Sequence, residues 1–111
     1  LDGTTIRDYI HIKDLAIIHK KIFLKMRKNI KNIILNCGYG NGYSTMEIAN
    51  YFVKKSKYKI KISFNKKKKS DLPKSVADNK KIIKILNWKP KYTNINTILR
   101  HSLNWEKKLE K

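Results

Sequence analysis

Apolar residues recur at helical spacing in the first half of the chain and predict two helices there. The first is expected from Asp14, a good N-cap residue, to about Lys28. Its apolar stripe consists of Leu15, Ile18, Ile22 and Met26. Ser44 and Glu47 form the pattern of a capping box and predict the start of a second helix. The apolar face of that second helix consists of Ile48, Ala49, Phe52 and Val53.

Two further helices are predicted in the last third of the chain. A short one follows Asp78 and carries Ile82, Ile83 and Leu86. It ends at 88–90, Trp-Lys-Pro, because the residue before a proline is pushed out of helical geometry. A terminal helix is expected from Ile95 to about Leu109. Trp88 and Trp105 fall on apolar faces of these segments, so both are expected to pack in the core.

Three short segments have the composition of β-strands. Residues 4–12 are rich in β-branched side chains, 33–36 is a continuous apolar run, and 59–64 alternates lysine with isoleucine. The segment 65–77 contains a lysine run and a proline and is predicted to be a loop. Four helices and three strands in this order indicate a mixed α/β fold. Isolated short strands need a sheet to join, and the pattern leaves open whether this chain supplies one.

The size of the chain limits what it contains. With 111 residues, 41% of them hydrophobic, it is long enough for one small domain. No apolar run approaches the roughly 20 residues that a membrane span requires, so a soluble, cytoplasmic chain without membrane partners is expected. Cys37 is the single cysteine, and the three histidines lack ligand spacing. We therefore expect neither a disulfide nor a metal site.

The net charge of +19 suggests a polyanionic partner such as nucleic acid. However, only Arg7, Arg27 and Arg100 are arginines among the 27 basic residues, and base readout relies heavily on arginine forks. Abundant lysine, isoleucine and asparagine indicate instead a compositional drift of an AT-rich genome. We favour that explanation over specific nucleic-acid binding.

The segment 2–12 concentrates charged and aromatic residues at the very start of the chain, which predicts a piece of a larger protein. The Arg7 guanidinium suits a phosphate group, and the Tyr9 hydroxyl could assist it. A structural ion pair between Arg7 and a neighbouring acid is about equally consistent with these residues. No set of serine, histidine, cysteine and acidic residues has the spacing of a catalytic triad.

Two loops are weaker candidates for anion binding. Gly38, Gly40 and Gly42 match neither a Walker loop nor the dinucleotide-binding spacing, so a plain strand-to-helix turn is favoured. The lysine run 66–69 is expected to be a solvated surface. One lysine of that run beside Asp71 could nevertheless hold a phosphate and a sugar hydroxyl together.

Taken in order, these segments resemble the C-terminal part of the UDP-glucose 4-epimerase family, within the extended short-chain dehydrogenase/reductases. The resemblance covers essentially the whole chain, and its first block is the most specific. The matching blocks are 2–16, 35–44, 70–73 with 77–78, 86–92, and Trp105.

This resemblance implies a division of labour within a larger enzyme. The N-terminal Rossmann domain of the family binds NAD and carries a Tyr-x-x-x-Lys catalytic pair. Because the matching blocks belong to the C-terminal part, this chain is expected to supply neither the NAD site nor the catalytic pair. Residues 1–111 would form the C-terminal nucleotide-sugar-binding portion, without catalytic or cofactor-binding residues and inactive alone. The whole enzyme would be an NAD-dependent isomerase and a homodimer. It would interconvert UDP-glucose and UDP-galactose by removing a hydride from the sugar C4 and returning it to the other face.

The resemblance also assigns substrate-binding roles by position. Arg7 matches the arginine that binds the pyrophosphate, with Tyr9 close to it, and Asp71 matches the acid that bonds ribose hydroxyls. Lys68 stands where the family has a second phosphate-binding arginine, and it keeps the charge without the fork. Ser75 stands where some members place a tyrosine against the sugar. A small residue there would leave room for an N-acetyl group, so another nucleotide-sugar epimerase or dehydratase, such as a UDP-N-acetylglucosamine 4-epimerase, is the alternative.

Overall fold

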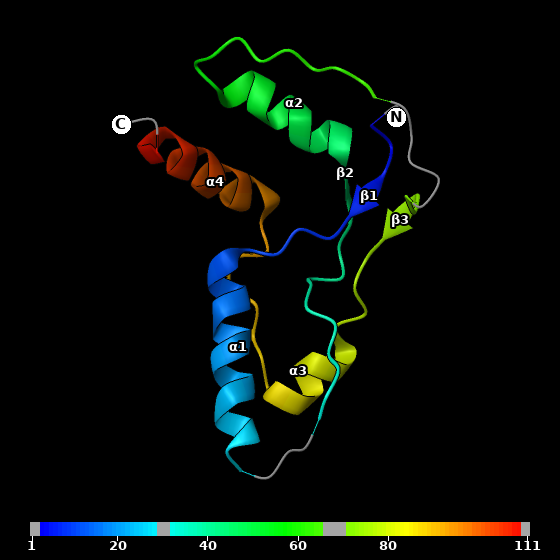
Figure 1. Ribbon diagram of the computed structural model, residues 1–111, viewed down its shortest axis with the longest axis vertical. Coiled ribbons are helices and arrows are strands. Elements are labelled where there is room, and N and C mark those ends of the chain that lie inside the picture. The colour runs from blue at the N-terminus through cyan, green and yellow to red at the C-terminus, as the bar shows by residue number, and fades with distance from the viewer. Residues whose placement is uncertain (1–2, 29–31, 66–70, 110–111) are drawn as a thin grey trace.

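The computed structural model describes residues 3–28, 32–65 and 71–109. The described residues form four helices and three two-residue strands, which alternate along the chain except that the last two elements are both helices. In order they are β1 (Ile6–Arg7), α1 (Ile12–Met26), β2 (Tyr43–Ser44), α2 (Thr45–Lys55), β3 (Lys74–Ser75), α3 (Lys80–Leu86) and α4 (Ile95–Leu109). Figure 1 shows α2 and α4 at one end of the molecule and α1 and α3 at the other, with the small sheet beside the N-terminus of α2.

The sheet has the order β2-β1-β3, so β1 is central. β1 runs antiparallel to β2 and parallel to β3, and this register places Arg7 opposite both Tyr43 and Ser75. Backbone bonds extend the pairing beyond the strands, from Ile6 N to Pro73 O and from Thr45 N to Thr5 O. The central strand β1 thereby brings together β2, some 40 positions further along the chain, and β3, some 70 positions further along.

The main core lies between α1 and α3. Ile18 of α1 and Ile82 of α3 are completely buried, and Leu86 and Trp88 complete the cluster. Each such side chain contributes about 1.5–3 kcal/mol through burial. The predicted core position of Trp88 is therefore confirmed.

The second helix pair, α2 and α4, packs at the other end of the molecule. Leu99 is the buried apolar residue of α4, and the Tyr51 hydroxyl of α2 donates to the carbonyl of Asn96. Trp105 lies on a different face of α4 and is 60% exposed. The prediction that Trp105 packs in the core is wrong for this structure, because α2 covers only one face of α4.

The capping box at the start of α2 is confirmed. The Ser44 hydroxyl accepts from the Glu47 amide at 3.2 Å, and the Glu47 carboxylate accepts from the Ser44 amide at 2.7 Å. These bonds to Ser44 lower the pKa of Glu47. The terminal helix 95–109 and the helix after Asp78 are confirmed as well.

The predicted cap of the first helix is wrong. His11 is the N-cap residue, and its Nδ1 accepts from the Lys13 amide at 3.0 Å. Asp14 lies within the first turn of α1 with its side chain completely buried. The Asp14 carboxylate does not cap the helix because it accepts hydrogen bonds from Tyr39, Lys91 and Tyr92, which lie far away in the sequence.

The strand predictions are mostly wrong, since only Ile6–Arg7 of 4–12 forms a strand and neither 33–36 nor 59–64 does. β2 and β3 form instead within segments predicted to be loops. The reason is that a strand requires a hydrogen-bonding neighbour, and β1 provides one only for these two short segments. The apolar run 33–36 has no regular secondary structure and lies beside α1 and α3, with Ile34 86% exposed.

Among the described residues, no helix combines the length and the hydrophobicity that crossing a membrane requires.

Candidate functional site

A cleft of about 450 Å³ lies beside the central strand β1. Arg7 and Asp71 line it together with Thr5, the first turn of α2 and the segment 62–65. Two of the residues predicted to bind substrate, 64 positions apart in the chain, therefore share one cleft.

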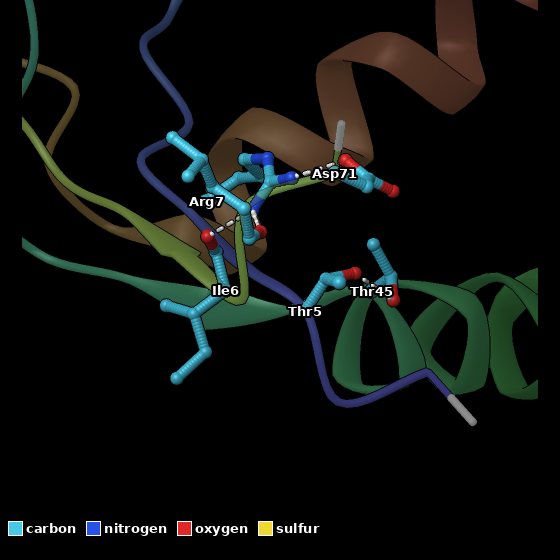
Figure 2. A network of polar contacts seen from close by, with 6 residues as sticks. Thr5, Ile6, Arg7, Thr45 and Asp71 are labelled. Carbon is cyan, nitrogen blue, oxygen red and sulfur yellow. Dashed lines mark hydrogen bonds and ion pairs between the residues drawn. The ribbon is translucent and has the colours of Figure 1, made fainter. Parts of the chain in front are cut away.

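Arg7 and Asp71 are also in direct contact, as Figure 2 shows. Arg7 Nη2 lies 2.8 Å from Asp71 Oδ1, and Nη1 donates to the carbonyls of Ile6 and Leu72 at 2.8 and 2.9 Å. The side chains of the pair are 30% and 36% exposed. The guanidinium has five N–H groups, so two remain without a partner among the described residues.

The ion pair matches the structural alternative that the sequence left open, but its strength is limited. Partly exposed pairs contribute only about 0–1 kcal/mol, because water competes for both ions. A dianionic diphosphate attracts the guanidinium more strongly than one carboxylate does. The geometry therefore allows Arg7 to exchange Asp71 for a phosphate, which releases the carboxylate to accept hydrogen bonds from hydroxyl groups.

The other predicted site residues are placed differently. Tyr9 follows β1 and does not line the cleft; its half-burial raises the pKa of the phenol, partly offset by the positive charge of Arg7. Ser75 is exposed on β3, directly opposite Arg7 in the parallel register. Lys68 lies outside the described residues.

Asp8, which the sequence reasoning did not single out, organises the glycine-rich loop. Its carboxylate accepts from the backbone amides of Tyr39, Gly40 and Ala77 at 3.0, 2.8 and 3.3 Å. These amides already bind an anionic group of the chain itself, so the loop is a turn clamped to β1. The favoured interpretation of this loop as a plain turn agrees with these contacts. The feature of the sequence that could have indicated this role is the density of polar residues in the segment 2–12, because buried polar side chains require hydrogen-bond partners.

Gly38 allows this clamp to close. A Cβ atom at this position would lie 2.5 Å from Asp8 Oδ2 and 2.6 Å from the Cβ of Ala77. We therefore expect Gly38→Ala to lower the free energy of unfolding by about 1–3 kcal/mol through overpacking. Chemical denaturation measures this change.

Gly40→Asn is the matched control for Gly38→Ala. Gly40 has a positive φ of 77°, which asparagine tolerates, and a Cβ there would meet no atom closer than 3.7 Å. A loss of stability in the control as large as that in Gly38→Ala would contradict the steric explanation.

Asp14 joins three segments in the interior. Its Oδ2 accepts from the Tyr39 hydroxyl at 2.7 Å and from the backbone amides of Lys91 and Tyr92 at 3.0 and 2.9 Å. Burial and the hydrogen bond to Asp14 both raise the pKa of Tyr39. The phenol is thus protonated at neutral pH and acts as the donor to Asp14. No group of three or more histidine, cysteine or acidic side chains in the described part of the chain is placed to hold a metal ion.

Comparison with known proteins finds sequences and solved structures that are similar to this chain. A UDP-glucose 4-epimerase of Azospirillum brasilense is 38% identical over 109 residues, which is 98% of this chain and 31% of the relative. A solved UDP-glucose 4-epimerase superposes with a TM-score of 0.83 at 34% identity, covering 96% of this chain and 32% of that one. The chain resembles a C-terminal part of the UDP-glucose 4-epimerases, in sequence and in fold.

The resemblance and the fold class predicted from the sequence are thus confirmed. The epimerase of Bifidobacterium longum, solved in complex with NAD⁺ and UDP, matches at 33% identity and a TM-score of 0.78, over 96% of this chain and 31% of that structure. No family model matches the chain. The chain spans about one third of the length of the UDP-glucose 4-epimerases that it matches.

Proposed function

We propose that this chain provides the UDP-binding part of a UDP-glucose 4-epimerase. The observation that supports the proposal most strongly is the meeting of Arg7 and Asp71 in one cleft. Their positions had been assigned to pyrophosphate and ribose binding from the resemblance alone. The names of the relatives point to the same substrate class. They do not favour the nucleic-acid alternative.

In the proposed mechanism, this chain anchors the nucleotide while the sugar stays free to turn. Arg7 leaves Asp71 and forms charge-assisted bonds to the diphosphate, and Asp71 then accepts from the ribose hydroxyls. The resemblance assigns a second positive charge to Lys68, and places Tyr9 close to the pyrophosphate and Ser75 close to the sugar, although neither Tyr9 nor Ser75 lines the cleft in this structure. An anchor on the nucleotide allows the keto sugar to rotate without dissociating, which the return of a hydride to the opposite face requires.

NAD is assigned to another part of the protein. The glycine-rich loop of this chain does not fit a dinucleotide pyrophosphate, because Asp8 already binds the loop amides of Tyr39 and Gly40. We infer that an N-terminal Rossmann domain binds NAD and carries the catalytic Tyr-x-x-x-Lys pair. Residues 1–111 form the C-terminal portion in this proposal, and the whole enzyme is a cytoplasmic homodimer.

Expression of the whole reading frame tests the proposal. The upstream sequence is expected to contain a glycine-rich strand–helix turn and a Tyr-x-x-x-Lys pair, and the protein is expected to interconvert UDP-glucose and UDP-galactose. UDP-N-acetylhexosamines should be assayed in parallel, because the small Ser75 leaves room for an N-acetyl group. Light scattering then tests the dimer. An upstream sequence with neither motif, or a protein without epimerase activity, would reject the assignment.

The isolated chain, residues 1–111, is expected to self-associate and to show no epimerase activity. Ile12, Phe23 and Ile34 are 71%, 63% and 86% exposed, and such side chains favour association when no other domain covers them. Size-exclusion chromatography with light scattering measures the effect, with the product of the whole reading frame as the control. A monomeric, fully active chain of 111 residues would contradict both the domain assignment and this prediction.

A further inference from the structure

Two histidines, 90 positions apart in sequence, join the start of α1 to α4. His11 Nε2 lies 2.8 Å from His101 Nδ1, and the two rings meet edge to face. The His11 ring is also stacked on Tyr92, with 4.3 Å between the ring centroids. His11 is only 4% exposed, whereas His101 is partly exposed, so the bond between them lies at the edge of the packed interior.

The proton positions in this pair follow from its bonds. The backbone amide of Lys13 is necessarily a donor, so His11 Nδ1, which accepts from it, carries no proton. A neutral His11 therefore has its proton on Nε2 and donates it to His101 Nδ1. Both nitrogens of His11 are in use, one to cap α1 and the other to hold α4.

This arrangement cannot accept a further proton without breaking a bond. A proton on His11 Nδ1 would displace the Lys13 amide and remove the cap of α1. A proton on His101 Nδ1 would face the N–H of His11 Nε2, and two donors do not bond. We propose that the His11–His101 pair is an acid-sensitive latch between α1 and α4, closed when both rings are neutral.

The surrounding charges favour the neutral, closed form. Burial lowers the pKa of His11, and the adjacent His101 and the Lys13 cation lower it further, while the Asp14 carboxylate opposes them. Tyr92 covers the ring, and the Tyr39 hydroxyl accepts from the His11 backbone amide at 3.2 Å. As the pH falls through the usual histidine range near 6.5, the unfolded chain takes up protons that the closed latch excludes, so stability declines.

The latch borders an open groove of about 800 Å³. Release of the latch would therefore change a measurable quantity, the distance between the two walls of the groove. Both histidines line this groove, together with Ile12 and Lys13 of α1 and Trp105 and Lys108 of α4. Acid release of the latch is expected to let the two walls separate. This inference does not rest on the proposed epimerase function, because it uses only the junction of α1 and α4.

Spin labels on the two walls of the groove test the latch. The labels are carried by Lys13→Cys and Lys108→Cys in the protein from the whole reading frame. Cys37 is replaced by serine, and any cysteine outside residues 1–111 is replaced as well, so that no other thiol reacts with the label. A single distance population is expected at pH 8, and a second, longer population at pH 5.5. The variant His101→Gln keeps an acceptor for His11 but cannot be protonated, so its longer population at pH 5.5 should be lost.

His19→Gln is the matched control, because His19 lies on the exposed side of α1 and bonds only to Leu15 O among the described residues. The His19→Gln variant should show the same longer distance population at pH 5.5 as the protein with an intact His19. Nitrogen NMR of the histidine rings at pH 8 should independently show the His11 proton on Nε2. Unchanged distances at acid pH, equal opening in His101→Gln, or a proton on His11 Nδ1 would each overturn the latch. Epimerase activity does not enter any of these measurements, so the two proposals fail separately.

Discussion

Arg7→Ala in the whole protein is expected to weaken UDP binding by about 2–4 kcal/mol, a roughly 30- to 900-fold rise in Kd. The substitution removes an arginine that lines the cleft, and the diphosphate of UDP would then lack the bidentate partner that the proposal assigns to it. It also leaves Asp71, which lies 2.8 Å from Arg7, as an unpaired negative charge facing the incoming phosphates. Isothermal titration with UDP measures the change.

Two further variants separate substrate binding from structure. Arg7→Lys keeps the charge and loses the fork, so it should recover part of the lost affinity. Asp71→Asn should weaken UDP binding less than Arg7→Ala, because only bonds to the ribose are reduced. If Arg7→Ala left UDP affinity unchanged but lowered the unfolding temperature, Arg7 would be a structural ion-pair partner only.

Asp14→Ala is expected to produce the largest loss of stability, about 3–5 kcal/mol in the free energy of unfolding. The substitution leaves three buried donors, the Tyr39 hydroxyl and the amides of Lys91 and Tyr92, without their acceptor. It also creates a cavity at a position with no solvent exposure. Urea denaturation of the whole protein measures the loss.

Asp78→Ala is the matched control for Asp14→Ala, because Asp78 is exposed and accepts from the Lys80 amide only locally. Asp14→Asn should cost less than Asp14→Ala, since the amide oxygen has two lone pairs and can still accept two of the three bonds that Oδ2 accepts now. Equal stabilities of Asp14→Ala and Asp78→Ala would show that the buried network contributes little.

Of the five residues predicted to bind substrate, two line the cleft in the described part of the chain, and the contact between these two was not predictable. Arg7 and Asp71 stood out because a guanidinium and a carboxylate occur in polar segments that match a known family. That the two side chains meet depends on β1 and β3 lying side by side. The clamp made by Asp8 likewise depends on bringing positions 39, 40 and 77 to one carboxylate, a closure with no local spacing rule.

The four helices could be located from the sequence, because the hydrogen bonds and caps of a helix join residues that are close together in the chain. The capping box of Ser44 and Glu47 and the span 95–109 were therefore correct from pattern alone. The strands depend on tertiary contacts, since a strand forms where a distant segment bonds to it. Tertiary contacts also explain why the Asp14 carboxylate binds donors in the interior while His11 caps α1, because burial and long-range donors outweigh a local preference for capping.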